Sequence, residues 1–153
     1  GPITMRLFYA TDFMDQLEHA IIPALRAGFI VLSDRYIYTL MARAIVRGAD
    51  PAWVKSLYGM AIIPDAVFYM MVRPQILIER NFQKKATLDY WESGMDIGYS
   101  SDMFRSFFSY QHQIQKQFKK MQDEYGFQII NGNRSMKTIF NDLKTRISKL
   151  LPQ

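Results

Sequence analysis

An apolar run that ends abruptly in charged residues constrains this sequence more than any other feature. Residues 29–33 read Phe-Ile-Val-Leu-Ser, and Asp34, Arg35 and Tyr36 follow them directly. A short, continuous apolar run is typical of a parallel strand that is buried on both faces. Because open parallel sheets bind ligands at the carboxyl ends of their strands, we expect Asp34 and Arg35 at a ligand-binding edge. The arginine could grip phosphate oxygens and the aspartate could hold a metal-bound water. The alternative is a structural ion pair at the end of the strand.

Length and composition narrow the class of protein. A chain of 153 residues predicts a single domain over residues 1–153. The sequence has no cysteine, which excludes disulfides, thiolate metal sites and a cysteine nucleophile within it. No apolar run approaches the roughly 20 residues that span a bilayer, so we expect a cytoplasmic protein without a membrane partner. The net charge of +5 is spread along the chain, which favours nucleotide phosphates over a nucleic-acid partner. His19 and His112 have no partner at metal-ligand spacing, so no directly bound metal is expected.

The hydrophobic periodicity alternates between helical and strand patterns along the chain. Helices are expected at residues 4–27, 36–47, 51–57, 74–82, 101–125 and 135–150, and strands at residues 29–33, 66–72 and 127–130. This alternation predicts an α/β fold, a parallel sheet flanked by helices and joined by right-handed crossovers. The apolar residues of the last helix are expected to face the core. Residues 83–100 lose the periodicity and are predicted to form a lid-like loop.

Helix ends have local signals of their own. N-caps are expected at Asp50, at Ser100 or Ser101, and at Ser135, because these short polar side chains satisfy the first free N–H groups of a helix. Pro23 is expected to kink the last turn of the first helix, because proline supplies no N–H to the helix.

A set of motifs in a fixed order resembles the thymidylate kinases. The set consists of Leu25-x-x-Gly28, Val31-x-x-Asp34-Arg35-Tyr36, Pro64-Asp65 before a strand, and Trp91-Glu92 in the lid-like loop. The resemblance covers essentially the whole chain. It implies a P-loop NTP hydrolase-like (thymidylate kinase-like) fold. It also implies transfer of the γ-phosphoryl group of ATP, bound with Mg²⁺, to dTMP or a related nucleoside monophosphate. The relatives are homodimers, which implies the same for this chain.

The resemblance also implies roles for individual residues. Arg35 would hold the acceptor phosphate, and Asp34 would lie beside the magnesium ion and contact it only through water. Arg80 would join them as a catalytic residue and, with Lys84 and Lys85, would form the lid. Catalysis would then consist of positioning and of positive charge around the transferred group. The implied substrate-binding residues are Tyr9, Phe13, Tyr36, Thr39, Arg43 and Glu92, and the implied ATP-binding residues are Asn133, Arg134 and Ser135. Tyr9 would stack on the acceptor base, and Glu92 would contact the acceptor or order the lid.

The sequence departs from the family pattern in two respects. The phosphate-binding loop Gly-x-x-x-x-Gly-Lys-Ser/Thr does not occur in it, so we expect the carboxyl-terminal part of a kinase domain, without its amino-terminal strands and inactive by itself. In the family, the strand that leads into this loop lies between the strands expected here at residues 29–33 and 66–72. A missing segment or another chain would fill that position, or the remaining strands would pair differently. Phe13 and Ala44 stand where the family usually has an arginine and a glutamine that read thymine, which predicts no strong thymidine preference. Thr39 and Arg43 could substitute for them. The alternative function is a non-catalytic, kinase-derived interaction module; an RNA-binding domain lacks any ordered aromatic-basic motif.

Overall fold

The structure, a computed structural model, describes residues 1–85 and 87–151, without the side chains of Lys84 and Lys85. The predicted lid lysines therefore lie outside the described side chains. The chain divides into two compact units, residues 1–63 and 64–153, and each is described by itself. None of the helices in the described part is both long enough and apolar enough to cross a membrane.

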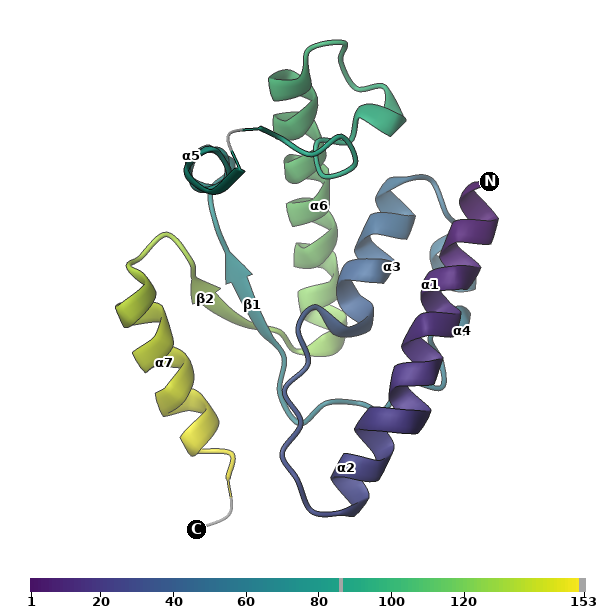
Figure 1. The fold of residues 1–153 in the computed structure, drawn as a ribbon, viewed down its shortest axis with the longest axis vertical. Helices are drawn as coiled ribbons and strands as arrows, with labels where there is room; N and C mark the ends of the chain where they lie inside the picture. The colour runs from purple at the N-terminus through teal and green to yellow at the C-terminus, as the bar shows by residue number, and fades with distance from the viewer. Residues whose placement is uncertain (86, 152–153) are drawn as a thin grey trace. The chain divides into compact units, whose positions relative to one another are not determined.

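The regular secondary structure of the first unit is all helical (Figure 1). Its elements are α1 (Pro2–Gln16), a π-helical turn (Leu17–Ile21), α2 (Ile22–Arg26), α3 (Tyr36–Val46) and α4 (Pro51–Leu57). The long first helix is confirmed, and its irregularity lies just before Pro23. Because Pro23 has no N–H to donate four residues back, the chain widens into a π-helical turn at this point.

The core of the first unit forms where α1 packs on α3 and α3 packs on α4. Phe13 and Leu17 are buried on the first helix, Met41 lies buried on α3, and Val54 is fully buried on α4. The guanidinium of Arg6 adds a polar link by donating to the carbonyl of Arg47 at 3.1 Å. This packing fixes the start of α3, and with it the residues that immediately precede the helix.

The strand predicted at residues 29–33 is wrong. The segment has no regular secondary structure, and Phe29, Ile30 and Leu32 have 68%, 64% and 78% of their surface exposed. A β-strand satisfies its backbone groups only beside another strand. The described part of the first unit contains no strand that could pair with it. The apolar run is therefore left in contact with solvent.

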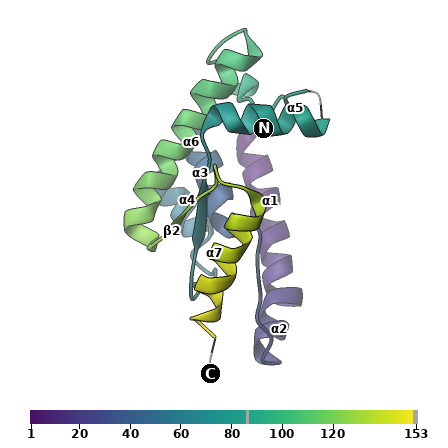
Figure 2. The same cartoon turned by 90° about the vertical axis from the view of Figure 1, so that its left-hand side faces the viewer.

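The second unit is built on two parallel strands, β1 (Phe68–Met71) and β2 (Gln128–Asn131), with Tyr69 opposite Ile129. Its helical elements are α5 (Pro74–Lys85), a 3₁₀ turn (Met95–Ile97), α6 (Met103–Tyr125) and α7 (Met136–Ser148). Figures 1 and 2 show the strands between α6 and α7. On the α6 side, the ring of Tyr69 stacks on Phe118 at 4.7 Å. A small parallel sheet flanked by helices confirms the predicted α/β fold class.

Helix ends and the last helix test the local predictions. The side chains of Asp50 and Ser135 accept the expected capping hydrogen bonds, so both N-caps are confirmed. The N-cap of α6 was expected at Ser100 or Ser101, which is wrong, because the carboxylate of Asp102 accepts from the N–H of Arg105 at 2.8 Å. The prediction that the apolar residues of α7 face the core is also wrong in part. Met136 and Phe140 are 85% and 65% exposed, because none of the described elements of the unit covers that side.

Candidate functional site

The Asp34-Arg35-Tyr36 segment forms a three-residue turn at the start of α3. The N–H of Tyr36 donates to the carbonyl of Asp34 at 2.8 Å, and Arg35 between them has φ 66° and ψ −39°. This geometry corresponds to a γ-turn with positive φ, which is rare and strained. Tyr36 itself has φ 46°. Backbone conformations of this kind cost a residue with a side chain about 1–3 kcal/mol and cluster at functional sites.

The side chain of Tyr36 is attached to the rest of the first unit at both ends. Its hydroxyl donates to the carbonyl of Ile62 at 2.9 Å. Its ring meets Phe13 edge-on, with the ring centres 5.2 Å apart, and lies 6.0 Å from the ring of Tyr38. Burial raises the pKa of the Tyr36 hydroxyl, and the hydrogen bond to Ile62 opposes that rise in part. The hydroxyl therefore stays protonated and keeps its role as a donor.

Asp34 and Arg35 both face solvent. Among the described residues neither side chain makes a hydrogen bond or an ion pair, so the alternative of a structural ion pair has no support in the structure. An unpaired guanidinium keeps its whole fork of donors for a ligand, and phosphate is the group that such a fork fits best.

The other predicted residues of the first unit divide between surface and core. Tyr9 is exposed on α1. Thr39 and Arg43 lie half-buried on α3, three and seven residues after Tyr36, so the three share one face of the helix. Phe13 is buried against Tyr36 and packs on the core. Its ring can therefore give the start of α3 a firm support, but it has no hydrogen-bonding group for a base.

In the second unit, the residues after β1 and β2 meet at the carboxyl edge of the sheet. The N–H of Arg73, which follows β1, donates to the side-chain oxygen of Asn133, which follows β2, at 2.9 Å. The guanidinium of Arg80 on α5 donates to the carbonyl of Arg134 at 3.4 Å. Arg80, predicted as a catalytic residue, is thus brought together with Asn133 and Arg134, predicted as ATP-binding residues, at the edge where open α/β sheets bind ligands.

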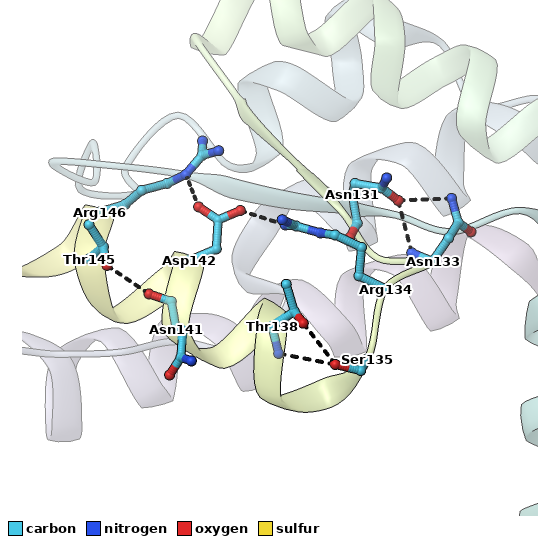
Figure 3. A network of polar contacts seen from close by, with 9 residues as sticks. All are labelled: Asn131, Asn133, Arg134, Ser135, Thr138, Asn141, Asp142, Thr145 and Arg146. Atoms are coloured by element: carbon cyan, nitrogen blue, oxygen red, sulfur yellow. Dashed lines mark hydrogen bonds and ion pairs between the residues drawn. The ribbon is translucent and has the colours of Figure 1, made fainter.

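A polar network holds Arg134 in place (Figure 3). Its Nε donates to the carbonyl of Asn131 at 3.0 Å, and its terminal nitrogen pairs with the carboxylate of Asp142 on α7. Arg146, one turn further along α7, donates to the other oxygen of Asp142 at 2.7 Å. The hydrogen bonds from Arg134 and Arg146 lower the pKa of Asp142 below its usual value. Ser135 caps α7 and has no direct part in the network.

Sequence reasoning missed Asp142 and Asn131, although each left a signal. Asp142 and Arg146 have the i, i+4 spacing of an ion pair on a helix. Asn131 precedes Gly132 in a turn, and its side-chain oxygen accepts from both the backbone and the side-chain nitrogen of Asn133 at 3.0 Å.

Glu92 lies in a compact turn within the predicted lid-like loop. The carboxylate of Asp89 accepts from the N–H groups of Trp91 and Glu92, both at 2.9 Å. The carbonyl of Glu92 accepts from the side chain of Gln111 on α6 at 3.3 Å. The Glu92 backbone is therefore held against α6, and its half-buried side chain extends from this fixed backbone.

Comparison with known proteins gives one consistent result. The family model described as "Thymidylate kinase" matches residues 1–143. A probable thymidylate kinase 2 of Saccharolobus solfataricus is 41% identical over 143 residues, which are 93% of this chain and 67% of that protein. A probable thymidylate kinase of Thermococcus kodakarensis is 27% identical, over 95% of this chain and 64% of that protein. A thymidylate kinase of Shouchella clausii is 29% identical, over 97% of this chain and 67% of that protein. The chain thus spans about two thirds of the length of these relatives.

Proposed function

The chain belongs to the thymidylate kinase family, and on this basis we propose that the protein transfers the γ-phosphoryl group of ATP to a nucleoside monophosphate of the dTMP kind. One observation carries the proposal furthest. A strained turn exposes the guanidinium of Arg35, and no side chain in the described part neutralises it. A positive charge without a partner, at a costly backbone position, fits the recognition of a phosphate.

Phosphoryl transfer needs little covalent chemistry from a protein, because catalysis rests on alignment and on neutralising the charge of the transferred group. Arg35 would bind the acceptor phosphate, and Tyr9 would stack on the acceptor base. In the second unit Arg80 would add positive charge as part of the lid, with Lys84 and Lys85. Asn133, Arg134 and Ser135 would lie on the adenine side, and Glu92 would contact the acceptor or order the lid.

Asp34 is the residue whose chemistry suits a magnesium ion. Its carboxylate is exposed and has no partner in the described part, and magnesium prefers hard oxygen ligands and keeps several of its waters. Asp34 would hold the ion through such a water. When bound with ATP, the ion would neutralise phosphate charge; the chain's own part is to orient the ion and the acceptor.

A homodimer is part of the same proposal. The first helix carries large apolar side chains on its surface, among them Ile3, Leu7 and Phe8. A cluster of exposed apolar side chains on one helix is typical of an association surface. A second copy of α1 is the partner that the family suggests.

Replacing Arg35 by Lys in the full-length protein tests the phosphate role. Lysine keeps the charge but loses the paired donors, so turnover of ATP with dTMP should fall by more than about tenfold, or roughly 1.4 kcal/mol of transition-state stabilisation. Arg26→Lys, at an exposed arginine of α2, is the matched control and should keep full turnover. A smaller loss in Arg35→Lys would contradict the role. If the wild-type protein neither phosphorylates dTMP nor binds nucleotide, the alternative of a non-catalytic interaction module is favoured.

The acceptor base is tested with a panel of monophosphates. Because Phe13 is buried and offers no hydrogen bond, and Ala44 has no polar group, recognition of thymine would depend on Thr39 and Arg43. We expect no strong preference for dTMP over dUMP or dCMP in kcat/KM. A preference of about a hundredfold would contradict this part of the proposal.

A further inference from the structure

We propose that Tyr36 is a positioning residue for Arg35: its attachment to Ile62 and Phe13 holds the strained turn that presents the guanidinium. The inference rests on the proposed function, because it concerns the same phosphate-binding arginine. It changes the role of Tyr36, which the resemblance assigned to substrate binding.

The turn needs an external support because its backbone is unfavourable. Arg35 has φ 66°, and a residue with a Cβ is more stable at negative φ. If the turn relaxed to negative φ, the Arg35 side chain would leave the backbone in a different direction. The observed conformation therefore persists only where neighbouring contacts determine it more strongly than local preference does.

Tyr36 supplies contacts of the required kind, one residue after the strained position. Its N–H closes the turn on the carbonyl of Asp34 at 2.8 Å. Its hydroxyl donates to the carbonyl of Ile62 at 2.9 Å, and its ring rests edge-on against the buried ring of Phe13. The two side-chain contacts fix both ends of the Tyr36 side chain, so the backbone before it has little freedom to relax.

The hydroxyl of Tyr36 is also committed as a donor. A phenol has a single O–H, and here that group donates its hydrogen bond to the backbone carbonyl of Ile62. Tyr36 therefore has no proton to give to a phosphate. Its neighbour Arg35, whose donors are all unused in the described part, is the group that can do so.

A double-mutant cycle in the full-length protein tests the inference. The variants are Tyr36→Phe, Arg35→Ala and the two combined, and the assay measures kcat and KM for dTMP with saturating ATP. Removing only the hydroxyl should lower kcat/KM by about tenfold or more, because a small displacement of a positioned group is costly. With Ala at position 35, the same Tyr36→Phe change should have no further effect, because the two residues act as a unit.

Tyr58→Phe is the matched control. Tyr58 is a buried tyrosine whose ring centre lies 5.9 Å from that of Phe13, and among the described residues its hydroxyl makes no hydrogen bond. This variant should keep kcat/KM. Amide hydrogen exchange at residue 36 gives an independent readout, because a loosened turn should expose that N–H faster in Tyr36→Phe and not in Tyr58→Phe.

The outcomes separate the two proposals. If Arg35→Ala loses activity and Tyr36→Phe does not, or if the two losses multiply, the positioning role of Tyr36 is overturned and the proposed function stands. Unchanged exchange at residue 36 in Tyr36→Phe overturns the positioning role as well. If Arg35→Ala retains full activity, the proposed function fails at this site, and the inference fails with it.

Discussion

The strain at Arg35 can be measured without any substrate. Two variants, Arg35→Gly and Arg35→Ala, both remove the guanidinium, so the difference between them isolates the backbone. At φ 66° a Cβ is unfavourable, and glycine has none. We therefore expect the glycine variant to be the more stable of the two.

The magnitude follows from two opposing contributions. A positive-φ turn of this kind costs a residue with a Cβ about 1–3 kcal/mol. Glycine loses more backbone freedom on folding, which disfavours it by roughly 0.5–1 kcal/mol. The net advantage of glycine at position 35 should thus lie within about 0–2.5 kcal/mol in the free energy of unfolding, with a central value of about 1 kcal/mol.

Arg43 provides a matched control on the same helix. It is also an arginine, but it lies within α3, where glycine is less stable than alanine by about 1 kcal/mol. The sign of the Gly–Ala difference should therefore reverse between positions 35 and 43. Urea unfolding of the four variants of the full-length protein, followed by circular dichroism, measures both differences. Alanine at position 35 that is more stable than glycine, which is the sign expected at position 43, would refute the strained turn.

Two further predictions concern the second unit. Its arginine partners lower the pKa of Asp142, so the stability they contribute is present above the ordinary carboxyl value of 3.8 and is lost as pH falls through the lower folded-state value. Asp142→Asn should accordingly be less stable than wild type in urea at pH 6, with the gap closing in acid; a gap that is constant with pH would contradict this. Gly94 has φ 66°, and a Cβ there would lie 2.7 Å from the Cβ of Tyr110. Gly94→Ala should cost about 2–4 kcal/mol of unfolding free energy, and a urea midpoint like that of wild type would rule out this packing.

The sequence could predict interactions between residues that are close in the chain, but not those that depend on distant segments. Asp50 and Ser135 cap helices through bonds to residues three positions away, so their roles follow from neighbours in the sequence. The run at 29–33 has the composition of a buried strand, but a strand exists only beside another strand. That requirement is not met within the described part of its unit. The prediction that Met136 and Phe140 face the core failed for the same reason. An apolar helix face is buried only where another element covers it.

The candidate site followed a similar division. Asp34 and Arg35 could be singled out because charge directly follows an apolar run. The positive φ of Arg35 could not be predicted, because only glycine, asparagine or aspartate signals that conformation in a sequence. The part played by Tyr36 depends on Ile62, which is 26 residues away in the chain. Contacts at that distance depend on the packing of α1, α3 and α4 and have no local signature.

The two units position their arginines by different physical means. Arg35 owes its direction to a strained backbone held by an aromatic ring and a neutral hydrogen bond. Arg134 owes its direction to the charge of Asp142 and to the carbonyl of Asn131. Salt weakens a partly buried ion pair such as Arg134–Asp142 less than a fully exposed pair, and it weakens packing and neutral hydrogen bonds less still. An arginine placed by strain also keeps its whole guanidinium unpaired, whereas one placed by an ion pair gives part of its donor capacity to its partner. These differences fit the proposed roles, in which Arg35 holds the acceptor phosphate directly and Arg134 lies on the adenine side.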